Sequence, residues 1–272
     1  MNRTATMHGL ATRLLGALLI VFTATTQAQG LEILVPAYFY PAGKGLGYWN
    51  QMATAAPKAP IVAILNPNSG PGTAVDPSYV SVVTDLRAAG GKVLGYVHTS
   101  YSARPLAQVT QDILLYQAFY AVDGFFIDEM ANDGSATTVG YSASLYDYVK
   151  ALNPAYHVIG NPGTNTREVY VSRPTADAVV VFEGDPKAYR RFTPDSWAAS
   201  YPASRFGHLL YGVGDFAAAR SALDLAAQRN AALVYATNDK LKPNPWDSLP
   251  SYWSSLITEV CLRNGGSAAV CN

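Results

Sequence analysis

The sequence has few charged residues, and the charges that it has are balanced. Charged side chains make up 14% of the 272 residues, with 19 Lys and Arg against 19 Asp and Glu, so the formal net charge is zero. A protein that binds nucleic acid neutralises a run of phosphates with a basic surface, and this composition does not supply one. We therefore expect no nucleic-acid partner.

Cysteine and histidine are also scarce. The two cysteines, Cys261 and Cys271, lie close together near the end of the sequence. In an exported chain they predict one disulfide that closes a short C-terminal loop, with two free thiols as the alternative. Beyond residue 30 the histidines are His98, His157 and His208, without the paired spacing of a zinc motif. We expect no catalytic metal and no other cofactor, and a metal-dependent barrel hydrolase is the alternative.

Beyond residue 30, no segment approaches the roughly 18 consecutive apolar residues of a membrane-spanning helix. The beginning of the chain differs, because basic Arg3 and Arg13 precede an apolar run from Leu14 to Phe22 and a small residue follows at Ala28. This pattern is typical of a secretory signal that is removed after residue 28. We expect a secreted or periplasmic protein that contacts no membrane after cleavage, and a retained N-terminal anchor is the alternative.

Short apolar runs rich in β-branched and aromatic residues recur beyond residue 30. Most are apolar on both faces, as expected of parallel strands that are covered on both sides. The first run is not followed by the G-x-G-x-x-G turn of an open nucleotide-binding sheet. Eight runs therefore predict a single α/β domain over residues 29–272, a closed (β/α)8 TIM barrel. The runs are Ile33 to Phe39, Ile61 to Leu65, Val93 to Val97, Gly124 to Ile127, Tyr156 to Ile159, Ala178 to Phe182, Phe206 to Tyr211 and Ala232 to Ala236.

Segments with helical spacing lie between these runs. Asp76, followed by Pro77, and Asp215 stand where an N-cap belongs, and Gly90-Gly91 stands where a helix should stop. The expected helices are Tyr79 to Ala89, Leu106 to Tyr120, Tyr141 to Leu152, Phe216 to Asn230 and Trp253 to Arg263.

Polar side chains follow every predicted strand, whereas the opposite strand ends carry mostly Gly, Ala, Lys and Pro. The active sites of (β/α)8 enzymes lie at the carboxyl ends of the strands, so these polar residues are the candidates. His98 has a second interpretation, as a hydrogen-bonded core histidine. We expect substrate contacts from Tyr38, Tyr40, Asn66, Asn68, His98, Tyr101, Asn161, Tyr211, Asn238 and Asp239.

Three acidic residues end two of the most apolar strands. Asp128 and Glu129 follow one strand, and Glu183 ends another two strands further on. A buried carboxylate without a partner is costly, so such groups usually have a role or a partner. Side chains alternate along a strand, so Asp128 and Glu129 should point to opposite faces unless the strand has begun to flare, and one should support the other. The alternative for each is a helix cap or an ion pair with a loop arginine.

Two carboxylates that face each other across a cleft are the arrangement that glycoside hydrolysis requires. Five stretches of this sequence resemble the spherulin-4 (spherulation-specific) family, classed as glycoside hydrolase family 135. These stretches are Val35 to Pro41, Asn66 to Gly72, Gly95 to Tyr101, Asp123 to Glu129 and Val180 to Gly184.

The resemblance implies a (β/α)8 hydrolase that cuts α-1,4-linked galactosamine and N-acetylgalactosamine stretches of exopolysaccharides such as galactosaminogalactan. It also implies an acidic trio at Asp128, Glu129 and Glu183. We assign Asp128 as nucleophile or stabiliser, Glu183 as general acid/base and Glu129 as a supporting carboxylate, with the order within the trio open. We expect an endo-acting, retaining monomer whose partner is the polysaccharide. A non-hydrolytic carbohydrate-binding or biofilm-matrix protein is the main alternative.

Overall fold

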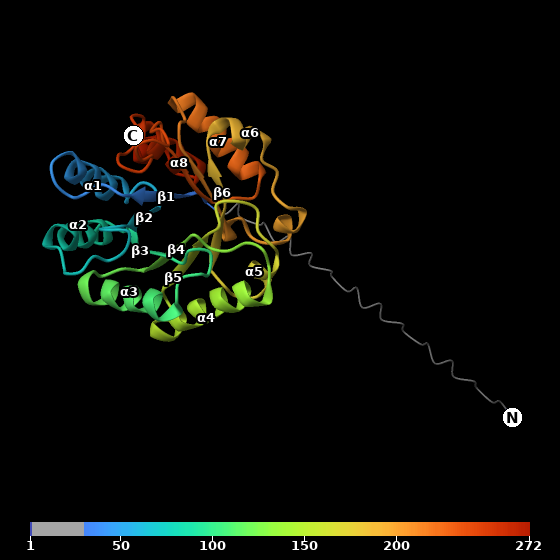
Figure 1. The fold of residues 1–272 in the computed structure, drawn as a ribbon. Helices are drawn as coiled ribbons and strands as arrows, with labels where there is room; N and C mark the ends of the chain where they lie inside the picture. Colours follow the sequence, from blue (N-terminus) through green and yellow to red (C-terminus); the bar gives the residue numbers. More distant parts are fainter. Residues whose placement is uncertain (2–29) are drawn as a thin grey trace.

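Eight parallel strands close into a barrel in chain order, with helices around it (Figure 1). The computed structural model describes residue 1 and residues 30–272, so the signal expected over residues 1–28 lies, apart from residue 1, outside the described residues. The (β/α)8 barrel is confirmed, and each predicted strand is present. The strands are β1 (Glu32–Ala37), β2 (Ile61–Leu65), β3 (Lys92–His98), β4 (Gly124–Asp128), β5 (His157–Asn161), β6 (Ala178–Gly184), β7 (Phe206–Leu210) and β8 (Leu233–Ala236).

All five predicted helices are present, within a few residues of the expected bounds, among nine α-helices in the described part. Asp76 and Asp215 cap two of them by accepting hydrogen bonds from Ser78 N and Ala218 N. The main helices are α1 (Lys44–Ala55), α2 (Pro77–Ala88), α3 (Leu106–Phe119), α4 (Ala136–Leu152), α7 (Phe216–Gln228) and α8 (Trp253–Arg263), and the shorter ones are α5 (Val169–Ser172), α6 (Pro186–Arg191) and α9 (Ala268–Cys271).

Helix α1 was not predicted, and its sequence explains why. It contains Gly45 and Gly47, which lower intrinsic helix propensity, and its first residue follows Gly43 without a side-chain cap. Packing stabilises it instead, because Trp49 and Met52 are fully buried. Gly45 is also required by space, since a Cβ there would collide with the carbonyl oxygen of Tyr40.

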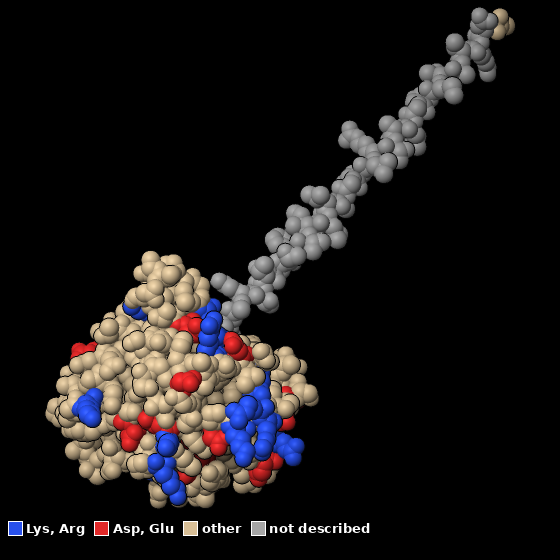
Figure 2. Space-filling view, turned by 90° about the horizontal axis from the view of Figure 1, so that it is seen from above, with Lys and Arg blue, Asp and Glu red and all other residues tan. Residues whose placement is uncertain are grey.

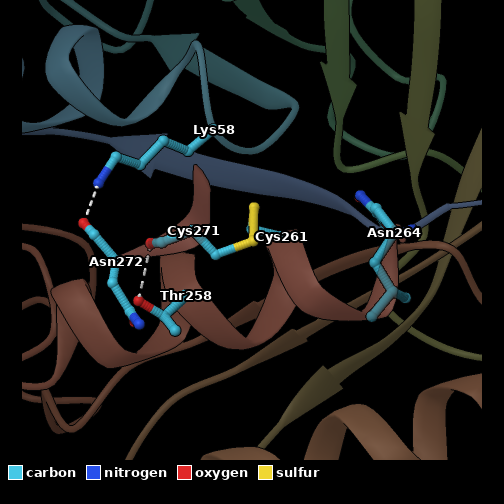
Figure 3. Close-up of a disulfide and its surroundings, with 7 residues drawn as sticks. Lys58, Thr258, Cys261, Asn264, Cys271 and Asn272 are labelled. Carbon is cyan, nitrogen blue, oxygen red and sulfur yellow. Dashed lines mark hydrogen bonds between the residues drawn. A yellow bond between two sulfur atoms is a disulfide. The ribbon is translucent and has the colours of Figure 1, made fainter. Parts of the chain in front are cut away.

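The C-terminal end of the chain is fastened to the start of the barrel. Cys261 and Cys271 form the predicted disulfide between α8 and α9 (Figure 3). Between them, the Asn264 side chain accepts from Leu31 N at 2.8 Å and donates to Leu31 O at 2.9 Å. The chain after the last barrel strand therefore holds the residue just before β1.

The surface has no dominant charge on the face seen in Figure 2, where acidic and basic side chains are scattered among neutral ones. Within residues 30–272, no helix is both long enough and apolar enough to cross a membrane.

Candidate active site

Three neighbouring strands bring polar side chains to one level of the barrel. Asp128 ends β4 in register with His98 of β3 and with Asn161 of β5. Side chains in register on parallel strands point to the same side of the sheet, so these three share one face at the carboxyl ends of the strands. The sequence predicted each of them, and the register brings them together.

Asn161 joins the two acids that lie on different strands. Its Nδ2 donates to Asp128 Oδ1 at 2.8 Å and to Glu183 Oε2 at 2.9 Å. The two bonded carboxylate oxygens are therefore no farther apart than the sum of these distances, so the two carboxyl groups lie close together. Asn161 is buried, and its Oδ1 has no hydrogen-bond partner among the described residues. Asn161 thus holds the acidic pair, and its substrate contact stays a prediction.

Tyr96 is a site residue that the sequence analysis missed. Its hydroxyl donates to Asp128 Oδ2 at 2.8 Å. Tyr96 lies inside the apolar run of β3, two residues before His98, and so its side chain shares the face of His98. The alternation of the strand was the signal that could have found it. The ring of Tyr38 packs edge-on against Tyr96 at 5.7 Å, so the predicted Tyr38 also lies beside the acids.

Burial and nearby charge raise the pKa of both Asp128 and Glu183. Desolvation is the main cause that raises the pKa of Asp128, and the hydrogen bonds from Tyr96, from the Glu129 backbone and from Asn161 oppose it. Desolvation also raises the pKa of Glu183, with a further rise from the charge of Asp128 and only Asn161 opposing. Asp128 thus has more donors that favour its ionised form. Burial and the nearby Asp128 likewise raise the pKa of Tyr38, which keeps its hydroxyl protonated.

The strand β6 is irregular just before Glu183. The pairing of β6 with β7 skips one residue between Val180 and Phe182, which is a β-bulge. Bulges redirect side chains next to active sites. Phe182 packs against His208 on the other side, while Glu183 faces Asn161. Gly163, at φ +66°, lies against Glu183 and exchanges backbone hydrogen bonds with β6.

The direction of the Glu129 side chain is not set by the alternation of a strand. Its φ is +51°, so the backbone has already turned out of the strand, as the expected flare allowed. Its carboxylate lies 3.4 Å from His98 Nδ1 and remains 40% exposed. Glu129 supports Asp128 through its backbone amide rather than through its carboxylate.

The loop after β3 is strained and firmly held. Ser100, Tyr101 and Ser102 all have positive φ, at 48°, 55° and 72°. Such conformations cost non-glycine residues about 1–3 kcal/mol each and persist only where the surroundings enforce them. Tyr101 N and Thr99 Oγ1 both donate to Glu129 O at 2.7 Å. The loop therefore presents Tyr101 from a backbone fixed to the acidic segment.

Several predicted residues organise loops around the site. Asn66 accepts from Gly70 N and closes the turn after β2, on which Asn68 is exposed. Asn238 accepts from Ser251 N, and Asp239 accepts from Ser248 Oγ. These contacts give Asn66, Asn238 and Asp239 structural roles.

Aromatic side chains line the same end of the barrel. Tyr211 packs edge-on against Trp246 at 6.2 Å, and Trp246 O accepts from Tyr38 N at 3.1 Å. Trp246 comes from the long loop after β8. It could not be predicted from the sequence, because it does not directly follow a strand. Tyr40 packs against Tyr79 of α2 and is exposed.

The other end of the barrel also has a cavity. A cavity of about 400 Å³ opens at the opposite, amino-terminal end of the barrel, beside Glu32, Lys92 and His157, away from the acidic trio. Among the described residues, no group of three or more His, Cys, Asp or Glu side chains is arranged to hold a metal ion.

A (β/α)8 barrel with two partly buried, amide-bridged carboxylates at the carboxyl ends of its strands indicates a carbohydrate-active protein. Residues 32–260 match the model of spherulation-specific family 4, and the chain belongs to that family. It is 32% identical to Spherulin-4 of Physarum polycephalum over 255 residues, covering 90% of this chain and 74% of that protein.

Solved structures share the barrel. Aspergillus clavatus Sph3, determined in complex with GalNAc, is 25% identical with a TM-score of 0.74, covering 85% of this chain and 98% of that one. The active domain 2 of a chitinase from Pyrococcus furiosus is 13% identical with a TM-score of 0.55, covering 87% and 96%. At that identity the chitinase likeness concerns the fold alone.

Proposed function

We propose that this protein is an exported glycoside hydrolase that cuts an amino-sugar polysaccharide, with α-1,4-linked galactosamine and N-acetylgalactosamine as the sugar class. The observation that carries the proposal is the Asn161 amide that bridges Asp128 and Glu183. Membership of spherulation-specific family 4 and the similarity to Sph3, whose structure contains GalNAc, support the choice of sugar. The signal-like first 28 residues support a secreted or periplasmic location.

In this proposal Asp128 stays ionised and acts at the anomeric carbon. Burial raises the pKa of Asp128 as it does that of Glu183, but Tyr96, Asn161 and the Glu129 amide all donate to Asp128 and oppose this rise, whereas only Asn161 donates to Glu183. Glu183 has its pKa raised by burial and by Asp128, so it holds a proton that it can give to the leaving oxygen. It then takes a proton from the incoming water, which completes the cycle.

The closeness of the two carboxyl groups supports retention of configuration. Carboxyl groups about 5 to 5.5 Å apart favour retention, with Asp128 attacking the anomeric carbon to form a covalent glycosyl intermediate. A substrate 2-acetamido group is the alternative nucleophile, in which case Asp128 orients and stabilises it. Both routes retain the configuration, and trapping with a 2-fluoro sugar separates them, because only the first leaves a sugar bound to Asp128.

The test replaces each of the two carboxyl groups by the amide of the same shape. Asp128→Asn and Glu183→Gln should each lower kcat on a galactosamine-rich polymer by about 10²- to 10⁴-fold, because each group acts in the transition state. Asp147→Asn, at an exposed position of α4, is the matched control and should keep the wild-type rate. Release of new reducing ends is the measurement.

Amide variants with near-wild-type rates would disprove these assignments. Tight binding of wild-type protein to the polymer without new reducing ends would instead favour the non-hydrolytic carbohydrate-binding alternative.

A further inference from the structure

Exposed aromatic side chains are confined to one side of the candidate site. Among the described residues only two aromatic rings are exposed, Tyr40 at 52% and Tyr101 at 65%. All 18 tyrosines of the sequence lie in the described part, and the other 16 are buried or partly buried. Both exposed rings belong to loops that follow barrel strands at the carboxyl end, after β1 and after β3.

The two rings follow strands on one side of Asp128, and the nearer strand, β3, pairs directly with β4. Asp128 and Glu183 end β4 and β6, whereas Tyr40 and Tyr101 follow β1 and β3, which pair through β2. Neighbouring strands are about 4.8 Å apart, so the bases of the two loops are separated by on the order of 10 Å. This spacing lets the rings contact different sugars of one extended chain.

Neither ring is loosely attached. The Tyr40 ring packs edge-on against Tyr79 at 5.5 Å, and its hydroxyl donates to Ser78 Oγ at 3.4 Å. Tyr101 stands on the left-handed turn whose amide is bonded to Glu129 O. That turn is closed behind it, because Arg104 N donates to Thr99 O. A ring that is already ordered loses little conformational freedom when a ligand stacks on it.

We propose that Tyr40 and Tyr101 form a polymer track, on which successive rings of a polysaccharide chain stack as the chain runs from the acids across β3 towards β1. The apolar faces of sugar rings match the flat apolar rings of tyrosine. The inference rests on the proposed function and adds to it that the enzyme selects long chains and cuts within them. Short substrates contact fewer of these rings than long chains do.

The experiment compares a long and a short substrate. Tyr40→Ala and Tyr101→Ala should each lower kcat/KM on a galactosamine-rich polymer by roughly tenfold, through KM rather than kcat. On a short N-acetylgalactosaminide with a chromogenic leaving group the loss should be clearly smaller, so the ratio of kcat/KM on the polymer to kcat/KM on the short substrate should fall. Tyr101→Trp should restore activity on the polymer, since it keeps a stacking ring. Leu114→Ala, at an exposed apolar position of α3, is the matched control.

Equal losses on both substrates, or no loss on the polymer, would overturn the track. Sedimentation with insoluble polymer separates this failure from failure of the proposed function, because retention needs no turnover. If the wild type and the tyrosine variants are retained equally, the track alone is wrong. If the wild type is neither retained nor active, both proposals fail.

Discussion

The hydroxyl of Tyr96 is the residue-scale feature that most directly controls Asp128. It donates to Oδ2 at 2.8 Å, and this bond lowers the pKa that burial raises. Tyr96→Phe should therefore raise the pKa of Asp128 and move the acidic limb of the kcat/KM profile to higher pH, by about one unit. The pH dependence of polymer cleavage is the measurement.

A matched pair tests whether this effect is local. The Tyr146 hydroxyl makes an equivalent 2.8 Å bond to Asp177, at the amino-terminal end of β6. Tyr146→Phe should leave the acidic limb where it is, because Asp177 takes no part in the proposed reaction. An acidic limb that does not move in Tyr96→Phe would exclude Asp128 as the group that must be ionised.

At the scale of elements, β7 is joined to α6 through a buried histidine. The His208 ring is fully buried, and its Nδ1 lies 2.8 Å from the Tyr189 hydroxyl. Burial is the main cause that lowers the pKa of His208 to about 3, and the charge of Arg229 adds to it. The unfolded chain takes up this proton near pH 6.5, whereas the folded protein does not until about pH 3.

His208 should therefore destabilise the fold progressively as the pH falls from about 6.5 towards 3, by up to about 1.4 kcal/mol per pH unit. Above pH 6.5 the histidine is neutral in both states and has no such effect. His208→Gln should flatten the fall of unfolding free energy with pH, as measured by urea unfolding at several pH values. Parallel curves for variant and wild type would contradict this account.

At the scale of the whole molecule, the disulfide and Asn264 connect the two ends of the described barrel. Cys261 and Cys271 close a short loop, which restricts the unfolded chain. Gly266 leaves room for the two sulfurs, because a Cβ there would lie 2.6 Å from each. Replacing both cysteines by Ala should lower the unfolding free energy by about 2.7 kcal/mol on the loop-entropy estimate.

Thermal unfolding with and without reductant measures this contribution. The double variant should be insensitive to reductant and should melt about 5–10 °C below the oxidised wild type. The acids lie at the other strand ends, so cleavage at low temperature should be unchanged. If complete reduction left the melting temperature of the wild type unchanged, Asn264 and α9 would be shown to keep the C-terminal segment in place without the disulfide.

The strand pattern, the capping aspartates and the disulfide could all be predicted from the sequence, because each depends on neighbouring residues or on covalent chemistry. The acids at Asp128 and Glu183 could be predicted for the same reason, since they end apolar strands. Helix α1 could not, because burial of Trp49 outweighs its two glycines only once the barrel exists.

Tertiary structure alone decided how the site residues meet. Strand register places Asn161 between two carboxylates that are 55 positions apart in the chain, and the β6 bulge accompanies the turn of Glu183 towards them. The partners of Tyr96 and Tyr101 are likewise set by contacts across strands. Local sequence determines which residues end a strand, but closure of the barrel determines which of those ends touch.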